Sequence, residues 1–306
     1  MNSMNGIINL YKPSGYTSHD AVARLKRFYG TRRVGHAGTL DPMACGVLPV
    51  LIGSACAAQD FLMNHDKVYR AGMRFGITTD TGDVTGTVLS EKPAAFSREE
   101  FLAALPHFLG RQKQIPPMYS AIKIGGKKLY ELAREGVTVE RASREIEIYD
   151  LTLVGQDSGR DYLVDVSCSK GTYIRTLCED IGNYLGTGGT LYSLERLSCG
   201  IFRKENAVTI EELQSLYEKN DTKALEACLI SPEKIFADFP AVRLSEFFAR
   251  LCRNGCELYL AKLRLSEADF PMGARVRLYD SEGMFFAVGT VTAYPNGAAI
   301  KATMRF

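Results

Sequence analysis

Residues 35–42 read GHAGTLDP and stand directly before an apolar run at residues 46–53. Glycines let a loop adopt unusual backbone angles and lie close to a ligand. Pro42 restricts Asp41 to an extended or turn conformation, so the Asp41 carboxylate is predicted to be presented by a loop. The apolar run predicts a buried strand that anchors this loop. An Asx-type turn, in which Asp41 caps its own backbone, is the competing interpretation.

The chain has 306 residues, of which 46% are hydrophobic and 24% charged, and its net charge is +2. This length predicts one large domain plus a small one, and the composition is ordinary for a soluble globular protein. The sequence has no apolar stretch as long as a membrane span, and residues 1–6 lack the features of a signal peptide. We therefore expect a cytoplasmic protein without a membrane partner.

The cysteines are scattered through apolar sequence. Only Cys252 and Cys256 are close together, and neither a second pair nor a nearby histidine completes a zinc site. Buried free thiols in a reducing compartment are the better interpretation. The sequence therefore implies no metal.

Helices and strands are interspersed along the first two thirds of the chain. Ser18 and Thr172 are predicted helix caps, while Ser97 and Thr209, each followed three residues later by a glutamate, predict capping boxes. Alternating or apolar segments predict strands at residues 67–76, 146–154 and 162–168. Because strands and helices do not alternate strictly, we predict an α+β fold with a mixed or antiparallel sheet.

The pattern changes after about Ser231. A helix at residues 245–254 precedes short strands near residues 275–279, 285–294 and 298–304, separated by turns. This pattern predicts a small β-barrel domain. The expected domain boundaries are therefore 1–230 and 231–306.

The chain has almost no net charge, but its sequence contains two clusters of basic residues. The first comprises Lys12, Arg24, Lys26, Arg27, Arg32 and Arg33, and the second comprises Arg111, Lys113, Lys123, Lys127 and Lys128. Tyr119 and Tyr130 are interleaved with the second cluster. Basic and aromatic side chains together suit phosphate contact and base stacking. A solvated face is the alternative for each cluster.

Two further positions carry candidate chemistry. Tyr69 falls on the apolar side of a predicted strand, where its hydroxyl needs a partner. Arg175 falls in the first turn of a predicted helix, where a cation opposes the helix dipole at a cost of about 0.3–1 kcal/mol. A buried carboxylate would offset this cost, and Asp41 is the candidate. An exposed Arg175 screened by solvent is the alternative.

Five segments carry a family resemblance. In chain order they are KPSGYTSHDAVARLKR, GHAGTLDPMACGVLPVLIG, KVYR with GITTDTGDVTG, PPMYSAIKIGGKKLYELAREG and CSKGTYIRTL. Together they resemble the bacterial tRNA pseudouridine-55 synthase family of the TruB type over about residues 12–202. The tail resembles the RNA-binding PUA-type domain of that family by architecture. The resemblance implies a pseudouridine-synthase fold, with a mixed, largely antiparallel sheet flanked by helices and a small C-terminal PUA-like β-barrel.

This resemblance implies an isomerase that converts the uridine at position 55 in the tRNA T-loop to pseudouridine. The target base would be flipped into a pocket, and a C-glycoside would form with the help of an aspartate. The implied partner is the T-arm of tRNA, no cofactor or metal is needed, and we expect a monomer. A segment at about residues 116–136 would close over the T-loop.

The resemblance also assigns roles to residues. The implied catalytic residues are Asp41, Tyr69 and Arg175, and the implied substrate- or RNA-binding residues are His36, Lys12, Lys170, Tyr173 and Leu194. Asp41 would attack the sugar or the base, or abstract a sugar proton, and these routes stay open. Tyr69 would stack on the flipped base and is a candidate for handling the C5 proton. Arg175 would keep Asp41 ionised.

The remaining assignments are less direct. His36 would help to displace the base, Lys12 and Lys170 would support a loop or contact phosphate, and Tyr173 and Leu194 would line the pocket. For the last four a purely structural role is the alternative, because buried Tyr and Leu are common in cores. Glu195 replaces a second basic residue that is frequent in the family, which removes one expected RNA contact.

Two other functions compete with a stand-alone enzyme. One is an RNA chaperone, and the other is a guide-RNA-dependent relative that needs partner subunits. The segment at residues 116–136 and the absence of a basic tail favour the stand-alone type.

Overall fold

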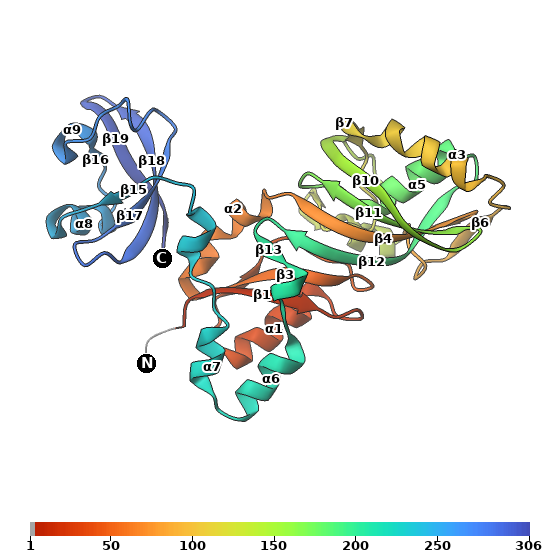
Figure 1. The fold of residues 1–306 in the computed structure, drawn as a ribbon, viewed down its shortest axis with the longest axis horizontal. Coiled ribbons are helices and arrows are strands. Elements are labelled where there is room, and N and C mark those ends of the chain that lie inside the picture. Colours follow the sequence, from red (N-terminus) through yellow and green to blue (C-terminus); the bar gives the residue numbers. More distant parts are fainter. Residues whose placement is uncertain (1–3) are drawn as a thin grey trace.

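The computed structural model describes residues 4–306 and contains a long mixed sheet and a smaller curled sheet (Figure 1). The long sheet has ten strands, eight of them in the order β14-β1-β3-β12-β4-β11-β10-β7, with β13 beside β12 and β2 beside β3. Its strands are β1 (Gly6–Lys12), β2 (Val34–His36), β3 (Cys45–Ile52), β4 (Lys67–Phe75), β7 (Gly110–Gln114), β10 (Arg144–Ser158), β11 (Asp161–Cys168), β12 (Gly189–Cys199), β13 (Phe202–Arg203) and β14 (Val208–Thr209). In this sheet only the β1–β14 and β12–β3 pairings are parallel, so the predicted mixed, largely antiparallel sheet is confirmed.

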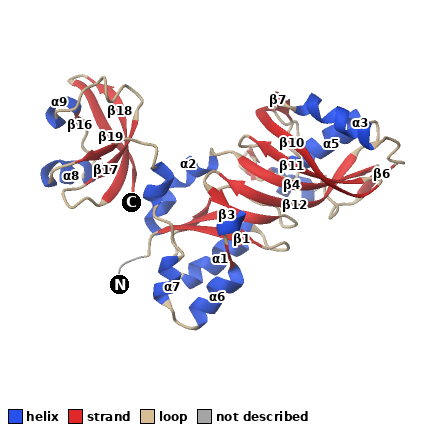
Figure 2. Cartoon of the chain, viewed as in Figure 1, coloured by secondary structure: helices blue, strands red, loops and turns tan. Residues whose placement is uncertain are grey.

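The helices form two groups along the long sheet (Figure 2). Those near β1 are α1 (Ser18–Phe28), α6 (Ile210–Glu218) and α7 (Thr222–Ala227). In the other group, α5 (Ile174–Tyr184) packs against β12 and β4, and α3 (Arg98–Ala104) stacks its Phe101 ring on Tyr162 of β11. The shorter helices are α2 (Gln59–Met63) and α4 (Leu129–Arg134), with 3-10 turns at Gly53–Ala58, Leu105–Phe108, Lys204–Asn206 and Pro232–Phe236. Two small hairpins pair β5 (Ile77–Thr79) with β6 (Val88–Glu91) and β8 (Lys123–Ile124) with β9 (Lys127–Lys128).

The apolar pattern of the sequence explains which strands are central. β3 is buried along almost its whole length because strands flank it on both sides and a core lies on each face. β4 buries alternate residues such as Tyr69, Ala71 and Met73. The apolar face of α1, including Ala21 and Leu25, packs into the same core as these strands.

Two predicted capping boxes are confirmed and two predicted caps are wrong. Ser97 and Thr209 both cap their helices with the expected glutamates. α1, however, is capped by Thr17, whose side chain accepts a hydrogen bond from the backbone of Asp20. Thr172 does not cap α5 either, because its hydroxyl donates to the Ser169 carbonyl instead and Tyr173 occupies the N-cap position. In both cases the hydroxyl that was predicted to cap the helix donates to a backbone carbonyl instead.

The C-terminal sheet has five strands in the order β15-β17-β18-β19-β16 and curls upon itself (Figure 1). Its strands are β15 (Ala241–Arg243), β16 (Leu258–Tyr259), β17 (Arg275–Tyr279), β18 (Phe285–Tyr294) and β19 (Gly297–Arg305), accompanied by α8 (Glu246–Arg253) and α9 (Leu260–Leu263). The predicted α+β fold with a small C-terminal PUA-like unit is confirmed.

An aromatic cluster joins the two sheets. The ring of Phe236 packs against those of Phe61, Phe239, Phe285 and Phe306, at centroid distances between 4.8 and 6.3 Å. The apolar cluster around these rings extends to residues of β3 in the long sheet. The small sheet is therefore packed against the large one by a shared core.

All eight cysteines are free thiols, as predicted, but only four of them are buried and Cys256 is exposed. Within residues 4–306, no helix is both long enough and apolar enough to cross a membrane.

Candidate active site

A cavity of about 310 Å³ opens beside the start of β4, between the Asp41 loop and α5. Five residues predicted from the sequence line its walls, namely Asp41, Tyr69, Tyr173, Arg175 and Leu194. They come from four separate segments of the chain, and the fold brings them together. Such convergence of polar side chains in a concave site is typical of a ligand-binding or catalytic pocket.

The loop that carries Asp41 is held by backbone contacts on both sides. The Ser18 hydroxyl donates to the Leu40 carbonyl at 3.2 Å and accepts from the Leu40 backbone N–H at 3.0 Å. After Asp41, the Pro42 carbonyl accepts from the Gly15 N–H at 2.8 Å. The hydroxyl that was expected to cap α1 therefore fixes the Asp41 loop, and the predicted presentation of Asp41 by a loop is confirmed.

Arg175 is the centre of the hydrogen-bond network around Asp41. Its Nε lies 2.9 Å from Asp41 Oδ2, while Nη1 and Nη2 donate to the carbonyls of Thr81 and Tyr119, each at 2.7 Å. The Arg175 side chain is 5% exposed, so the alternative of a solvent-screened arginine is wrong. The predicted ion pair between the first turn of α5 and the Asp41 loop is confirmed.

The pKa of Asp41 reflects two opposing effects. Burial raises the pKa of this carboxyl, and the adjacent Arg175 guanidinium is the main influence that lowers it. The carboxylate of Asp83 raises the pKa further. The net shift is upward, and Arg175 is the group that most favours the ionised form of Asp41.

Tyr69 lies on β4 with its side chain 8% exposed. Burial raises the pKa of its hydroxyl to about 12, although the Arg196 guanidinium beside it acts in the opposite direction. Tyr69 is therefore a neutral phenol near neutral pH, with its ring at the cavity wall.

The segment predicted to close over RNA forms part of the cavity. Ser120 and Ile122 line the wall, and the Ser120 carbonyl accepts from the Tyr130 N–H at 3.1 Å. Just before this segment, the Gln114 side chain donates to the Tyr173 carbonyl at 3.0 Å and accepts from its N–H at 2.8 Å. The start of α5 is thereby fixed to β7.

Three predicted residues lie outside the lining of this cavity. His36 is half-buried on β2 with its ring 5.8 Å from that of His19, and desolvation lowers its pKa to about 4, so it is neutral. Lys12 is fully buried and donates to the carbonyls of Pro13 and Tyr16. These bonds correspond to the loop-support alternative for Lys12.

Lys170 is exposed, and its Nζ lies 2.6 Å from Asn64 Oδ1.

Glu195, where this chain differs from the family pattern, interacts with side chains of the protein itself. Its carboxylate accepts from the Tyr11 hydroxyl at 2.8 Å and pairs with Lys204 at 2.6 Å. Glu195 thus joins β12 to β1 and to the turn after β13.

Sequence reasoning missed several charged residues near the site, among them Arg196 and Asp83. Arg196 is 1% exposed and lines the cavity, and Asp83 is 5% exposed and accepts hydrogen bonds from the Thr81 hydroxyl and the Thr85 backbone. The position of Arg196 within an otherwise apolar strand pattern is a sequence signal that could have indicated a buried charge. The threonine-rich run TTDTGDVTG around Asp83 is a signal for a structured polar loop.

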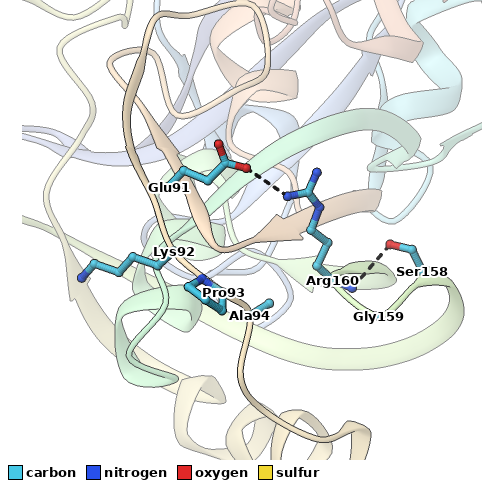
Figure 3. Close-up of a pocket in the computed structure, with 7 residues that line it drawn as sticks. All are labelled: Glu91, Lys92, Pro93, Ala94, Ser158, Gly159 and Arg160. Carbon is cyan, nitrogen blue, oxygen red and sulfur yellow. Dashed lines mark hydrogen bonds and ion pairs between the residues drawn. The ribbon is translucent and has the colours of Figure 1, made fainter.

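A second hollow lies away from these residues, between the end of β6 and the turn that joins β10 to β11 (Figure 3). Glu91 and Arg160 form an ion pair there with a distance of 3.4 Å. It is lined by Glu91, Lys92, Pro93, Ala94, Ser158, Gly159 and Arg160. None of the predicted catalytic side chains reaches it, so the cavity around Asp41 is the candidate active site.

Comparisons with known proteins identify similar sequences. The model of the N-terminal domain of TruB family pseudouridylate synthases matches residues 26–174, and that of the tRNA pseudouridylate synthase B C-terminal domain matches residues 175–237. A Clostridium perfringens protein named tRNA pseudouridine synthase B is 43% identical over 287 residues, covering 94% of this chain and 95% of that protein. A protein of the same name from Alkaliphilus oremlandii is 50% identical over 281 residues, covering 90% of each chain.

Solved structures show a similar fold. A chain of a Cbf5-Nop10-Gar1 complex superposes with a TM-score of 0.71 at 25% identity, covering 99% of this chain and 86% of that chain. A chain of an archaeal box H/ACA sRNP Nop10-Cbf5 complex gives a TM-score of 0.69 at 23% identity, with 99% and 87% covered. The sequence matches decide the family: this chain belongs to the TruB family of pseudouridylate synthases.

Proposed function

We propose that this chain is a stand-alone tRNA pseudouridine synthase that isomerises the uridine at position 55 in the T-loop. The observation that carries the proposal is the Asp41–Arg175 pair, which lies 2.9 Å apart in the wall of the cavity. The relatives named tRNA pseudouridine synthase B supply the substrate class. The cavity of about 310 Å³ falls at the lower end of the size range of small-ligand pockets, which suits one flipped nucleotide.

The reaction is an isomerisation, and its bonds balance without a redox partner. The C1′–N1 bond breaks, a C1′–C5 bond forms, the C5 proton leaves and N1 gains a proton. Asp41 serves as the covalent nucleophile on the sugar or the base, or as the base that removes a sugar proton. Because each of these roles requires a carboxylate, Arg175 contributes by favouring the ionised form and fixing its orientation.

The other site residues have supporting roles in this proposal. Tyr69 stacks on the flipped base and handles the C5 proton, while Tyr173 and Leu194 shape the pocket. His36 displaces the target base from the T-loop, and this role suits a neutral imidazole that has a buried Nδ1 without a partner among the described residues. Lys12 supports the loop through its carbonyl contacts, and the exposed Lys170 contacts phosphate.

RNA binding is divided between two parts of the chain. Residues 1–230 form the synthase domain, in which the segment at residues 116–136 closes over the T-loop with its lysines toward the phosphates. Residues 231–306 form the PUA-like domain and contact the remainder of the tRNA. The chain acts as a cytoplasmic monomer that needs neither metal nor cofactor.

Tritium release from C5-labelled uridine in a tRNA transcript tests this function. The expected result is release with wild-type protein alone and none with Asp41→Asn. If a well-folded wild-type protein binds tRNA but releases no tritium, the RNA-chaperone or partner-dependent alternative replaces the proposal.

A further inference from the structure

The proposed reaction leaves the buried cation Arg196 in the cavity without a role. Arg196 lies on β12 and is 1% exposed, and it heads the fully buried side chains by volume. β12 pairs with β4 so that Arg196 is directly opposite Tyr69, and it pairs with β3 so that Arg196 is opposite Gly46. The sheet register therefore places this arginine between the tyrosine strand and the strand that follows the Asp41 loop.

The contacts of Arg196 hold it in place without neutralising it. Its Nε donates to the Val47 carbonyl at 2.6 Å and its Nη2 to the Gly38 carbonyl at 3.0 Å. A Cβ on Gly46 would come within 2.3 Å of the Arg196 backbone, so the close approach of β3 requires glycine there. Among residues 4–306, no carboxylate pairs with Arg196.

A buried cation without a carboxylate partner is costly. The penalty for removing one ion from water is several kcal/mol in real proteins, and two carbonyl contacts compensate for part of it. Arg196 therefore reduces stability compared with an apolar residue of similar volume. A buried charge that lowers stability indicates a functional role, in which the charge interacts with bound substrate.

Most of the charged residues that line the cavity are positive. The basic residues in the cavity lining are Lys67, Arg144, Arg175 and Arg196, and the acidic one is Asp41. Lys67 is itself buried and donates to the carbonyls of Met63 and His65. Preorganised cations stabilise negative charge that develops beside them, most strongly once bound substrate has displaced water from the site.

The proposed reaction generates such a charge on the base. When the C1′–N1 bond breaks, its electron pair stays with uracil, so the detached base carries negative charge over N1, O2 and O4. The charge disappears once C5 bonds to C1′ and the C5 proton has been replaced by a proton on N1. We propose that Arg196 stabilises the negative charge on the detached uracil, from a position beside the Tyr69 ring on which the base stacks.

This inference rests on the proposed synthase activity. A backbone phosphate is the competing anion for Arg196. A phosphate contact contributes to RNA affinity and to its salt dependence. Stabilisation of the detached base instead contributes to the rate of the chemical step and leaves affinity unchanged.

The test uses Arg196→Gln and Arg196→Lys in the full chain. Each variant is assayed under single-turnover conditions with saturating enzyme on T-arm hairpins that carry uridine or 5-fluorouridine at the target position. The C-glycoside product is quantified by nuclease digestion and mass spectrometry. Fluorine withdraws electrons and stabilises the detached base by itself, so the rate on 5-fluorouridine depends less on Arg196.

Arg196→Gln is expected to lower the rate on uridine by about 10²-fold, the usual effect of removing one charge-stabilising group. The loss on 5-fluorouridine is expected to be clearly smaller, and Arg196→Lys should show the same pattern with smaller losses. Hairpin affinity should stay within about twofold of wild type. The matched control is Arg70→Gln. Arg70 lies on the neighbouring strand β4 and pairs with Asp165, and the control protein should convert both hairpins at the wild-type rates.

Equal losses on both hairpins by folded variants would overturn the proposal in favour of a structural role. Weaker binding with an unchanged rate at saturation would overturn it in favour of a phosphate contact. If Arg196→Gln is unfolded at the assay temperature, Arg196→Lys tests the proposal instead. The same comparison applies: its rate loss on uridine must exceed its rate loss on 5-fluorouridine. Failure of wild-type protein on both hairpins would instead refute the proposed function.

Discussion

Replacing Arg175 by methionine removes the guanidinium while keeping much of the side-chain volume. Asp41 loses its ion pair, and the carbonyls of Thr81 and Tyr119 lose their donors. Removing one partner of a buried pair costs about 3–5 kcal/mol. The Asp41 side chain is 34% exposed and water can reach it, so we expect a loss at the lower end, about 3 kcal/mol.

A loss of this size predicts that the melting temperature falls by about 6–12 °C, at about 2–4 °C per kcal/mol for a chain of this class. The rate should fall by about 10²–10³-fold, because the carboxylate is both misoriented and more easily protonated. Calorimetry and tritium release measure the two effects on the same preparation.

The matched control is Arg74→Met, which breaks a bidentate pair with Asp161 at 2.8 Å outside the cavity lining. The control should lose stability but keep its rate. An Arg175→Met protein with the rate and melting temperature of wild type would refute the reasoning about the pair.

Three further predictions concern the same site and the domain arrangement. Asp41→Asn should abolish turnover and leave tRNA affinity in a filter-binding assay nearly intact; measurable turnover would remove Asp41 from its catalytic role. The rate should fall on the acid side with a midpoint above the usual aspartate pKa of 3.8, because burial raises the pKa of Asp41 and only its ionised form is active. In Arg175→Met that midpoint should move to still higher pH, since the guanidinium lowers this pKa; a pH–rate profile with an unchanged midpoint would contradict the assignment. Truncation after residue 239 keeps Phe236 and should weaken binding of full-length tRNA while a T-arm hairpin is still converted; a folded fragment that is inactive on the hairpin would contradict the division of labour.

Local sequence patterns predicted the parts of the fold that depend on neighbouring residues. The alternation in β4 placed Tyr69 on the buried side, and the glycines and proline around Asp41 predicted a presented loop. The unfavourable position of Arg175 at a helix N-terminus pointed to a carboxylate partner, and the partner is Asp41. Each of these inferences uses residues close in sequence or a charge that needs compensation.

Features that depend on strand register could not be predicted from local sequence patterns. Arg196 faces Tyr69 only because β12 pairs with β4 in one specific register, and no local pattern encodes that pairing. The caps expected at Ser18 and Thr172 failed because both hydroxyls have a nearby backbone partner that the sequence does not reveal. His36 lies outside the cavity lining for a similar reason, since the path of β2 beside β3 determines its position.

The most direct test of the central claim is to locate the product in tRNA. A tRNA transcript is incubated with wild-type protein alone, treated with carbodiimide and alkali, and mapped by primer extension, with Asp41→Asn as the control. The account predicts a single pseudouridine-dependent stop that reports position 55 and appears with wild type only. A folded, tRNA-binding wild-type protein that gives no stop, or gives one at a different uridine, would contradict it.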